Sequence, residues 1–248
     1  MIHIFFRHYN VGNGSNSSRQ DDRYKARSAR RWGNVDSWFS YEKVFLNLLR
    51  TTAGTNVKIN VVMDGIVEEN WIAKYKDKFT QYEIVGGTDF ASFFPTMDIV
   101  KNDTSIQPND IVYLLENDYL HVDGWVSKVE ELYQMYGDNV SYVSLYDHLD
   151  KYIYDHYSHL REKIIITRTH HWRTTPSTTG TFMLSKKIFD EDYDIHSSRK
   201  EDHGKFVWLQ ENRNRFLITP IPGLSTHCVG ECSPTIDWQA ISDREVLQ

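Results

Sequence analysis

Cysteine is scarce in this chain, and long hydrophobic runs are missing. Only Cys228 and Cys232 occur among 248 residues, which excludes a disulfide framework and, with one histidine nearby, argues against a structural zinc site. No apolar run approaches the roughly 20 residues that span a bilayer, and the first residues are interrupted too early for a signal peptide. We therefore expect a soluble, cytoplasmic protein without an integral membrane segment.

An excess of positive charge is also missing. The formal net charge is −6 at neutral pH, whereas affinity for nucleic acid depends on cationic side chains that neutralise phosphates. Nucleic acid is therefore not expected as the main partner. Aromatic residues, in contrast, are common at 14%, with 15 Tyr and 7 Trp. Such a surplus suits stacking on sugars or bases, and it occurs equally in plain cores and interfaces.

The hydrophobic pattern predicts strands that alternate with amphipathic helices over the first 145 residues. Strands are expected at 2–6, 57–63, 82–85, 111–115 and 140–145, and helices at about 36–50, 67–79, 88–100 and 125–136. This alternation is typical of a doubly wound α/β fold, with a mostly parallel central sheet flanked by helices. We expect one domain over residues 1–248, with a less regular second half at 146–230 and a tail at 231–248.

The stretch Asp110–Tyr119 is the most informative part of the chain. Its apolar run at 111–115 reads as a strand buried on both faces, which ends at Glu116 and Asp118. Two acids spaced two apart in an extended segment point to the same side. A pair of carboxylates beyond a strand end suits a hard divalent cation that also holds a substrate's phosphates. The alternative is an ordinary polar turn.

Three further acids or imidazoles follow strands or begin helices. Asp64 ends the second strand, where it either lines the same crevice or serves as a turn residue before Gly65. Asp202 begins a helix next to Glu201, and it could take a proton from a hydroxyl, whereas Glu201 fits a capping box. His227 follows the last expected strand and is either a ligand or an ordinary surface histidine. Arginines at 19–31 could meet a phosphate or form a solvated face.

Taken in order, these residues resemble the GT-A fold of nucleotide-sugar glycosyltransferases. The likeness is carried by Asp64, Glu116-Asn117-Asp118, Gly180 to Leu184, Glu201-Asp202 and His227. It is greatest to the large inverting family that includes cellulose and chitin synthases. The resemblance covers about residues 1–230 and departs from that family in the Glu at position 116 and in a longer loop after the first strand.

The resemblance implies a role for each matched residue. Asp64 would read the base of the nucleotide, with uracil expected, and Glu116 would lie near the ribose and diphosphate. Asp118 would hold Mn²⁺ or Mg²⁺, and His227 would be a further ligand of the metal or of the diphosphate. Asp202 would be the catalytic base, with Glu201 beside it. The full set of expected donor contacts is Arg7, Tyr9, Asn10, Asp64, Gly65, Glu116 and Asn117, and the expected acceptor contacts are Trp172 and Tyr154.

The expected function is a metal-dependent transfer of a hexose from a UDP-sugar to a glycan or other hydroxyl acceptor, with inversion. Residues 1–145 would form the nucleotide-sugar-binding half and residues 146–230 the acceptor half. One alternative is a sugar-phosphate nucleotidyltransferase, although the loop at 12–16 lacks the Arg and Lys of that class. Another is a non-catalytic carbohydrate-binding protein that uses the aromatic segment 152–172.

Overall fold

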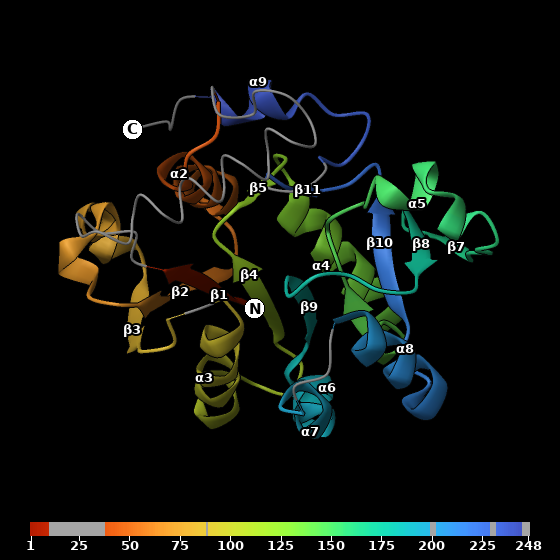
Figure 1. Cartoon of the computed structure of the whole chain (residues 1–248), viewed down its shortest axis with the longest axis horizontal. Helices are drawn as coiled ribbons and strands as arrows, with labels where there is room; N and C mark the ends of the chain where they lie inside the picture. The colour runs from red at the N-terminus through yellow and green to blue at the C-terminus, as the bar shows by residue number, and fades with distance from the viewer. Residues whose placement is uncertain (10–37, 88, 199–201, 229–231, 245–248) are drawn as a thin grey trace.

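A large mixed sheet runs through the centre of the protein (Figure 1). The computed structural model describes residues 1–9, 38–87, 89–198, 202–228 and 232–244. In these residues the strand order of the main sheet is β3-β2-β1-β4-β9-β6-β10-β8-β7. Strands β3, β2, β1 and β4 pair in parallel, whereas β9, β8 and β7 pair antiparallel to their neighbours. The expected α/β class, with a sheet that is mostly parallel in its core, is confirmed.

The strands of the main sheet are short, and most are buried. Their bounds are β1 Ile2–Tyr9, β2 Val57–Asp64, β3 Thr80–Ile84, β4 Ile111–Glu116, β6 Tyr142–Val143, β7 Ile164–Ile166, β8 His171–Thr175, β9 Phe182–Ser185 and β10 Leu217–Ile221. Strand β4 is buried from Ile111 to Leu115 and half-buried at Glu116. The apolar run therefore lies inside the sheet, and the first acid lies at its carboxyl end.

Helices cover both faces of the sheet (Figure 1). They are α2 Tyr41–Thr52, α3 Asp89–Asn102, α4 Trp125–Tyr136, α5 Asp150–Ile153, α6 Lys186–Glu191, α7 Tyr193–His196, α8 Asp202–Arg213 and α9 Trp238–Ser242. One core contains Phe45 of α2, Trp125 of α4 and Trp238 of α9. The other contains Met97 of α3 and Phe206 of α8. Burying both faces explains why the central strands lack polar alternation.

Several elements differ from the sequence expectation. The expected helix at 67–79 consists of two 3-10 segments, Val67–Glu69 and Trp71–Lys78, with a non-helical residue at Tyr75. Ser40 caps α2 by accepting a hydrogen bond from the Lys43 amide, at 3.1 Å, so the helix begins later than expected. The tail expected at 231–248 contains helix α9, and a short strand that was not expected follows β10.

A second, two-stranded sheet lies beyond the end of β4. Strand β5, Tyr119–His121, pairs antiparallel with β11, Ser225–His227, and His227 lies opposite Tyr119. The Cys228 amide also donates to the Asp118 carbonyl oxygen, at 2.8 Å. Neither strand was expected from the sequence, because three residues are too few for a hydrophobic period to be read. This small sheet brings the end of the chain against the acidic motif.

His121 of β5 provides a test of this packing through pH. It is fully buried, its ring lies 2.9 Å from the Tyr113 hydroxyl, and burial lowers the pKa of the imidazole to about 3. Below pH 6.5 the unfolded chain binds a proton at His121 that the folded chain does not, so stability is lost as pH falls from 6.5 towards 3. In His121→Gln, the free energy of unfolding should fall less steeply than in the unmodified protein as the pH is lowered from 6 to 4. The difference in slope should be about 1.4 kcal/mol per pH unit, measured by urea titration. If the free energy of unfolding had the same pH dependence in both proteins, the low pKa of His121 would be contradicted.

Candidate active site at the carboxyl ends of the strands

Arg7 and Glu116 face each other on neighbouring strands. The parallel register pairs these two residues, and Arg7 Nη2 lies 3.0 Å from Glu116 Oε1. The other carboxylate oxygen accepts a hydrogen bond from the Thr181 hydroxyl, at 3.0 Å. Burial raises the pKa of Glu116, Arg7 opposes that rise, and the nearby charge of Asp118 adds to it. Glu116 is thus an acid already held by a guanidinium and a hydroxyl.

Asp118 lies against His227, which is 109 residues away in the sequence. Asp118 Oδ2 and His227 Nε2 are 3.0 Å apart, and the His227 ring stacks on Tyr119 with ring centroids 4.9 Å apart. Asp118 Oδ1 is buried and makes no hydrogen bond within the described part of the chain. A buried carboxylate oxygen without a donor is costly. The pair therefore has an open acceptor position beside an imidazole.

Asn117, between the two acids, is bonded to the first strand. Its amide nitrogen lies 2.8 Å from His8 Nδ1, and His8 Nε2 lies 3.2 Å from Asn70 Oδ1. An amide nitrogen can only donate, so His8 accepts at Nδ1 and carries its proton on Nε2. Burial lowers the pKa of His8 to about 4, which keeps the ring neutral. This chain of bonds fixes the backbone that carries Glu116 and Asp118.

Asp64 ends β2 and holds the turn that follows β3. Its two carboxylate oxygens accept from the Gly86 and Gly87 amides, at 2.8 and 2.7 Å. Gly65 has a positive φ of 117° and donates its amide to the Ile84 carbonyl. Tyr9 lies opposite Asp64 in the register of β1 and β2. These hydrogen bonds support the interpretation of Asp64 as a turn residue. Its contact with a nucleotide stays a prediction.

Asp202 begins α8 and is paired with a lysine that the sequence did not single out. Lys205 Nζ lies 3.5 Å from Asp202 Oδ1, and the Lys205 side chain is 4% exposed, against 44% for Asp202. Burial lowers the pKa of Lys205, and Asp202 opposes that change. The ammonium also lies 4.7 Å from the centre of the Phe93 ring, which Arg7 approaches at 5.3 Å. Two cations therefore share one aromatic ring beside the crevice.

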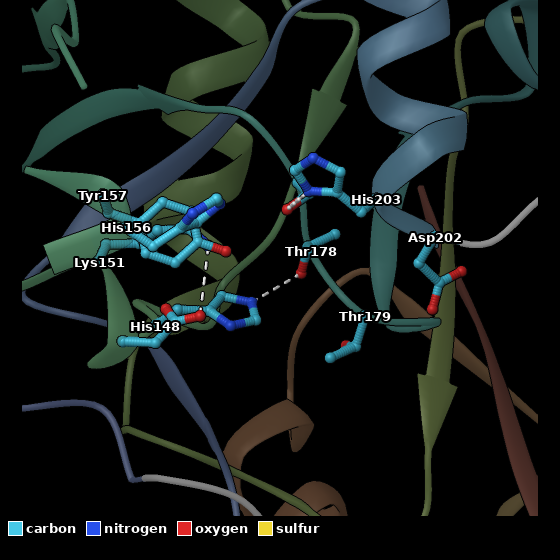
Figure 2. A pocket seen from close by; sticks show the side chains of 10 residues that line it. His148, Lys151, His156, Tyr157, Thr178, Thr179, Asp202 and His203 are labelled. Atoms are coloured by element: carbon cyan, nitrogen blue, oxygen red, sulfur yellow. Dashed lines mark hydrogen bonds and ion pairs between the residues drawn. The ribbon is translucent and has the colours of Figure 1, made fainter. Parts of the chain in front are cut away.

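A polar pocket of about 410 Å³ lies between Asp202 and the segment after β6 (Figure 2). In Figure 2, Asp202 and His203 come from α8, and His148 lies across from them. The lining residues are His148, Asp150, Lys151, His156, Tyr157, Ser177, Thr178, Thr179, Asp202 and His203. Thr179 also hydrogen-bonds to the Tyr119 hydroxyl, at 2.6 Å. Because Tyr119 stacks on His227, this contact joins the pocket to the Asp118–His227 pair.

The aromatic residues expected to bind an acceptor do not line this pocket. Trp172 is fully buried in β8, between β10 and β7, so its expected acceptor role is corrected. Tyr154 is half-exposed but is not part of the pocket lining. Asn10, Glu201 and the arginines at 19–31 lie outside the described residues.

A divalent cation fits the Asp118–His227 pair. No group of three His, Cys, Asp or Glu side chains that could hold a metal occurs in the described ranges. The unpartnered Asp118 Oδ1 and the imidazole nonetheless offer two ligands of types that Mn²⁺ accepts, and such ions commonly take their remaining ligands from substrate phosphates and water. The residues present thus suit a cation that binds together with a phosphorylated substrate.

Gly180 is a sensitive position next to the Arg7–Glu116 pair. A Cβ atom there would lie 3.0 Å from Arg7 Nη2 and 3.3 Å from Glu116 Oε1, so the pair would have to move. We expect Gly180→Ala to weaken binding of a phosphorylated ligand several-fold in calorimetric titration. Gly204→Ala is the matched control, because nothing lies within 4 Å of its Cβ position, and its affinity should stay unchanged. If both variants bound the ligand with equal affinity, the Arg7–Glu116 pair would not be part of the binding site.

No protein-family model matches the chain, and no curated protein matches it. Among solved structures, a protein from Desulfovibrio desulfuricans G20 assigned as a nucleotide-diphospho-sugar transferase is 13% identical, with a TM-score of 0.46, over 88% of this chain and 78% of that one. A nucleotidyl transferase from Methanothermobacter thermautotrophicus is 9% identical, with a TM-score of 0.45, over 88% and 86%. The galactosyltransferase LgtC, solved with donor and acceptor sugar analogs, is 10% identical, with a TM-score of 0.41, over 83% and 69%. These likenesses are too distant to assign a function, which has to be argued from the site.

Proposed function

We propose that this protein is a GT-A-type glycosyltransferase that moves a sugar from a nucleoside diphosphate to an acceptor hydroxyl. The observation that carries the proposal is the Asp118–His227 pair, at 3.0 Å, beyond the carboxyl end of β4. Ligands of open α/β sheets bind in the crevice outside these strand ends. A carboxylate with an open acceptor position beside an imidazole suits a cation bound to a diphosphate.

A basic side chain near the acidic motif supports a diphosphate as ligand. Arg7 lies 3.0 Å from Glu116, two residues before Asp118. When nucleoside diphosphate leaves, negative charge grows on its terminal phosphate, and fixed cations stabilise that charge. A bound Mn²⁺ or Mg²⁺, held by Asp118 and His227, would supply further positive charge to the leaving phosphate.

The proposed reaction is a single displacement. The acceptor oxygen forms a bond to the anomeric carbon of the donor sugar. The bond from that carbon to the phosphate oxygen breaks, and its electrons stay on the nucleoside diphosphate. The hydroxyl proton passes to the Asp202 carboxylate, which lines the pocket and is 44% exposed. Attack from the face opposite the leaving group inverts the configuration of that carbon.

Uridine diphosphate as the donor nucleotide and a hexose as the transferred sugar are the finer parts of the proposal. They rest on the resemblance of the ordered motifs and on Asp64 at the end of β2. Because both oxygens of Asp64 accept backbone amides, its contact with a base would use their remaining lone pairs. Tyr9 lies opposite Asp64 in the register of β1 and β2, and it is a second candidate contact for the same base.

A thermal-shift panel tests the donor. UDP-, GDP-, ADP- and CMP-sugars are each added with Mn²⁺, with Mg²⁺ and with chelator, because a ligand that binds the folded state raises the unfolding midpoint by mass action. We expect a UDP-sugar with metal to give the largest rise, and incubation of that sugar to release UDP. Formation of pyrophosphate from a nucleoside triphosphate would instead support a nucleotidyltransferase. No response to any nucleotide sugar would overturn the proposal.

A further inference from the structure

The pocket beside Asp202 is lined by side chains that carry hydroxyl, imidazole, carboxylate or ammonium groups. None of its ten lining residues has an aliphatic side chain or a thioether, and Tyr157 is the one Phe, Tyr or Trp among them. The face of that ring carries the Lys151 ammonium, 3.8 Å from the ring centre. A lipid chain would find no wall of aliphatic side chains here. An acyl or prenyl group is therefore a poor occupant of this pocket.

Three consecutive hydroxyls form one wall. Ser177 Oγ lies 3.0 Å from His203 Nδ1, Thr178 Oγ1 lies 3.2 Å from His148 Nε2, and Thr179 Oγ1 reaches Tyr119. Each hydroxyl both donates and accepts, and so does a neutral imidazole through its two nitrogens. The side chains of this wall can therefore both donate hydrogen bonds to the hydroxyls of a ligand and accept hydrogen bonds from them.

The charges in the pocket are paired. Lys151 Nζ lies 3.4 Å from Asp150 Oδ2, and Asp202 lies 3.5 Å from Lys205. Burial lowers the pKa of His148 well below its usual value, and the nearby positive charges of Lys151 and Arg173 lower it further. His148 is thus uncharged at neutral pH. A pocket with paired charges and a neutral imidazole offers little net attraction to a phosphate.

The pocket is also the right size and in the right place for an acceptor. Its volume of about 410 Å³ falls near the lower end of small-molecule pockets, which span roughly 300–1,000 Å³. Asp202 and Thr179 both line it, and Thr179 links the lining to Tyr119 and so to His227. Whatever enters it therefore lies next to the proposed base and next to a residue that connects to the proposed diphosphate site.

We infer that this pocket binds a neutral, polyhydroxylated acceptor, a free sugar or the terminal unit of a glycan, held by His148, His203 and the hydroxyls of 177–179. The inference rests on the proposed function and names the acceptor class of that same site. A lipid phosphate or a sugar phosphate is disfavoured as the acceptor unit, because the lining residues offer neither a wall of aliphatic side chains nor an unpaired lysine or arginine.

Direct binding tests the inference without turnover. Saturation-transfer NMR is recorded with methyl α- and β-glycosides of glucose, galactose, mannose and N-acetylglucosamine, with glucose 1-phosphate and with a short-chain polyprenyl phosphate. At least one neutral glycoside should receive saturation, and His203→Ala should abolish it. His171→Ala, an exposed histidine that does not line the pocket, should leave the signal intact. Signals from the phosphates alone, or a signal that persists in His203→Ala, would overturn the inference.

Kinetics with the best donor separate the two proposals. Ser177→Ala and His203→Ala should each raise the acceptor KM at least fivefold, while donor KM and hydrolysis of the donor in the absence of acceptor stay unchanged. Unchanged acceptor KM in both variants, with donor hydrolysis retained, would reject the acceptor pocket and leave the glycosyltransferase proposal standing. If no donor is hydrolysed or bound, the proposed function fails, and the NMR result alone decides whether the pocket binds sugars.

Discussion

Replacing Asp202 by asparagine is expected to lower turnover by about 100-fold or more, with little change in donor binding. The amide keeps the size of the side chain but cannot take the proton of the acceptor hydroxyl. Asp202 stands at the start of α8 and lines the pocket. The measurement is kcat with saturating donor and acceptor, alongside donor affinity from thermal shift.

The matched control for Asp202→Asn is Asp243→Asn. Asp243 is also about half-exposed and paired with a lysine, Lys43 at 2.7 Å, but it does not line the pocket. Its kcat should equal that of the unmodified protein. A kcat for Asp202→Asn within a factor of two of this control would remove Asp202 from its role as base and require another proton acceptor.

Replacing Asp118 by asparagine is expected to weaken metal-dependent donor binding by at least about tenfold. The change retains the shape of the side chain and removes the charge that a cation needs. Asp118 Oδ1, buried and without a hydrogen-bond partner in the described residues, is the atom expected to contact the cation, and in asparagine the carbonyl oxygen no longer carries negative charge. Manganese EPR measures the free and bound cation in titrations with and without nucleoside diphosphate.

His227→Gln should also weaken metal-dependent donor binding, but by less than Asp118→Asn. The glutamine side chain still offers an oxygen or nitrogen near Asp118. The double variant distinguishes a shared site from two separate roles. Two residues that hold one cation should be strongly non-additive, whereas independent positions add. Manganese titrations that overlay for the unmodified protein and both single variants would reject the metal assignment.

The strand that ends in the acidic motif could be predicted because its signal is local. Residues 111–115 form an unbroken apolar run, and such a run implies burial on both faces. The resemblance implied that Asp118 and His227 share one site, and the structure has the two side chains 3.0 Å apart. The first prediction needs no knowledge of loop conformation, whereas the second depends on the resemblance.

The pocket could not be predicted, because its walls come from loops and short elements. His148 and Ser177 lie in irregular segments whose conformation depends on distant contacts, and Lys205 is one of several charged residues on its helix. Trp172 was expected at the acceptor because it is aromatic and follows a histidine-rich stretch. It lies instead in β8, a strand that periodicity did not reveal, where the ring packs in the core.

The antiparallel pairing of β5 with β11 has a consequence for the lengths that this chain can tolerate. Side chains alternate between the two faces of a strand, so a shift by one residue would turn His227 away and present Thr226 or Cys228 to Asp118. An insertion or deletion of one residue between β10 and β11 that shifts this register would therefore move the His227 imidazole away from Asp118, although no residue of the site is replaced. Natural variation in length should be concentrated elsewhere, and the spacing from Ile221 to Ser225 should be kept in any redesign that retains activity.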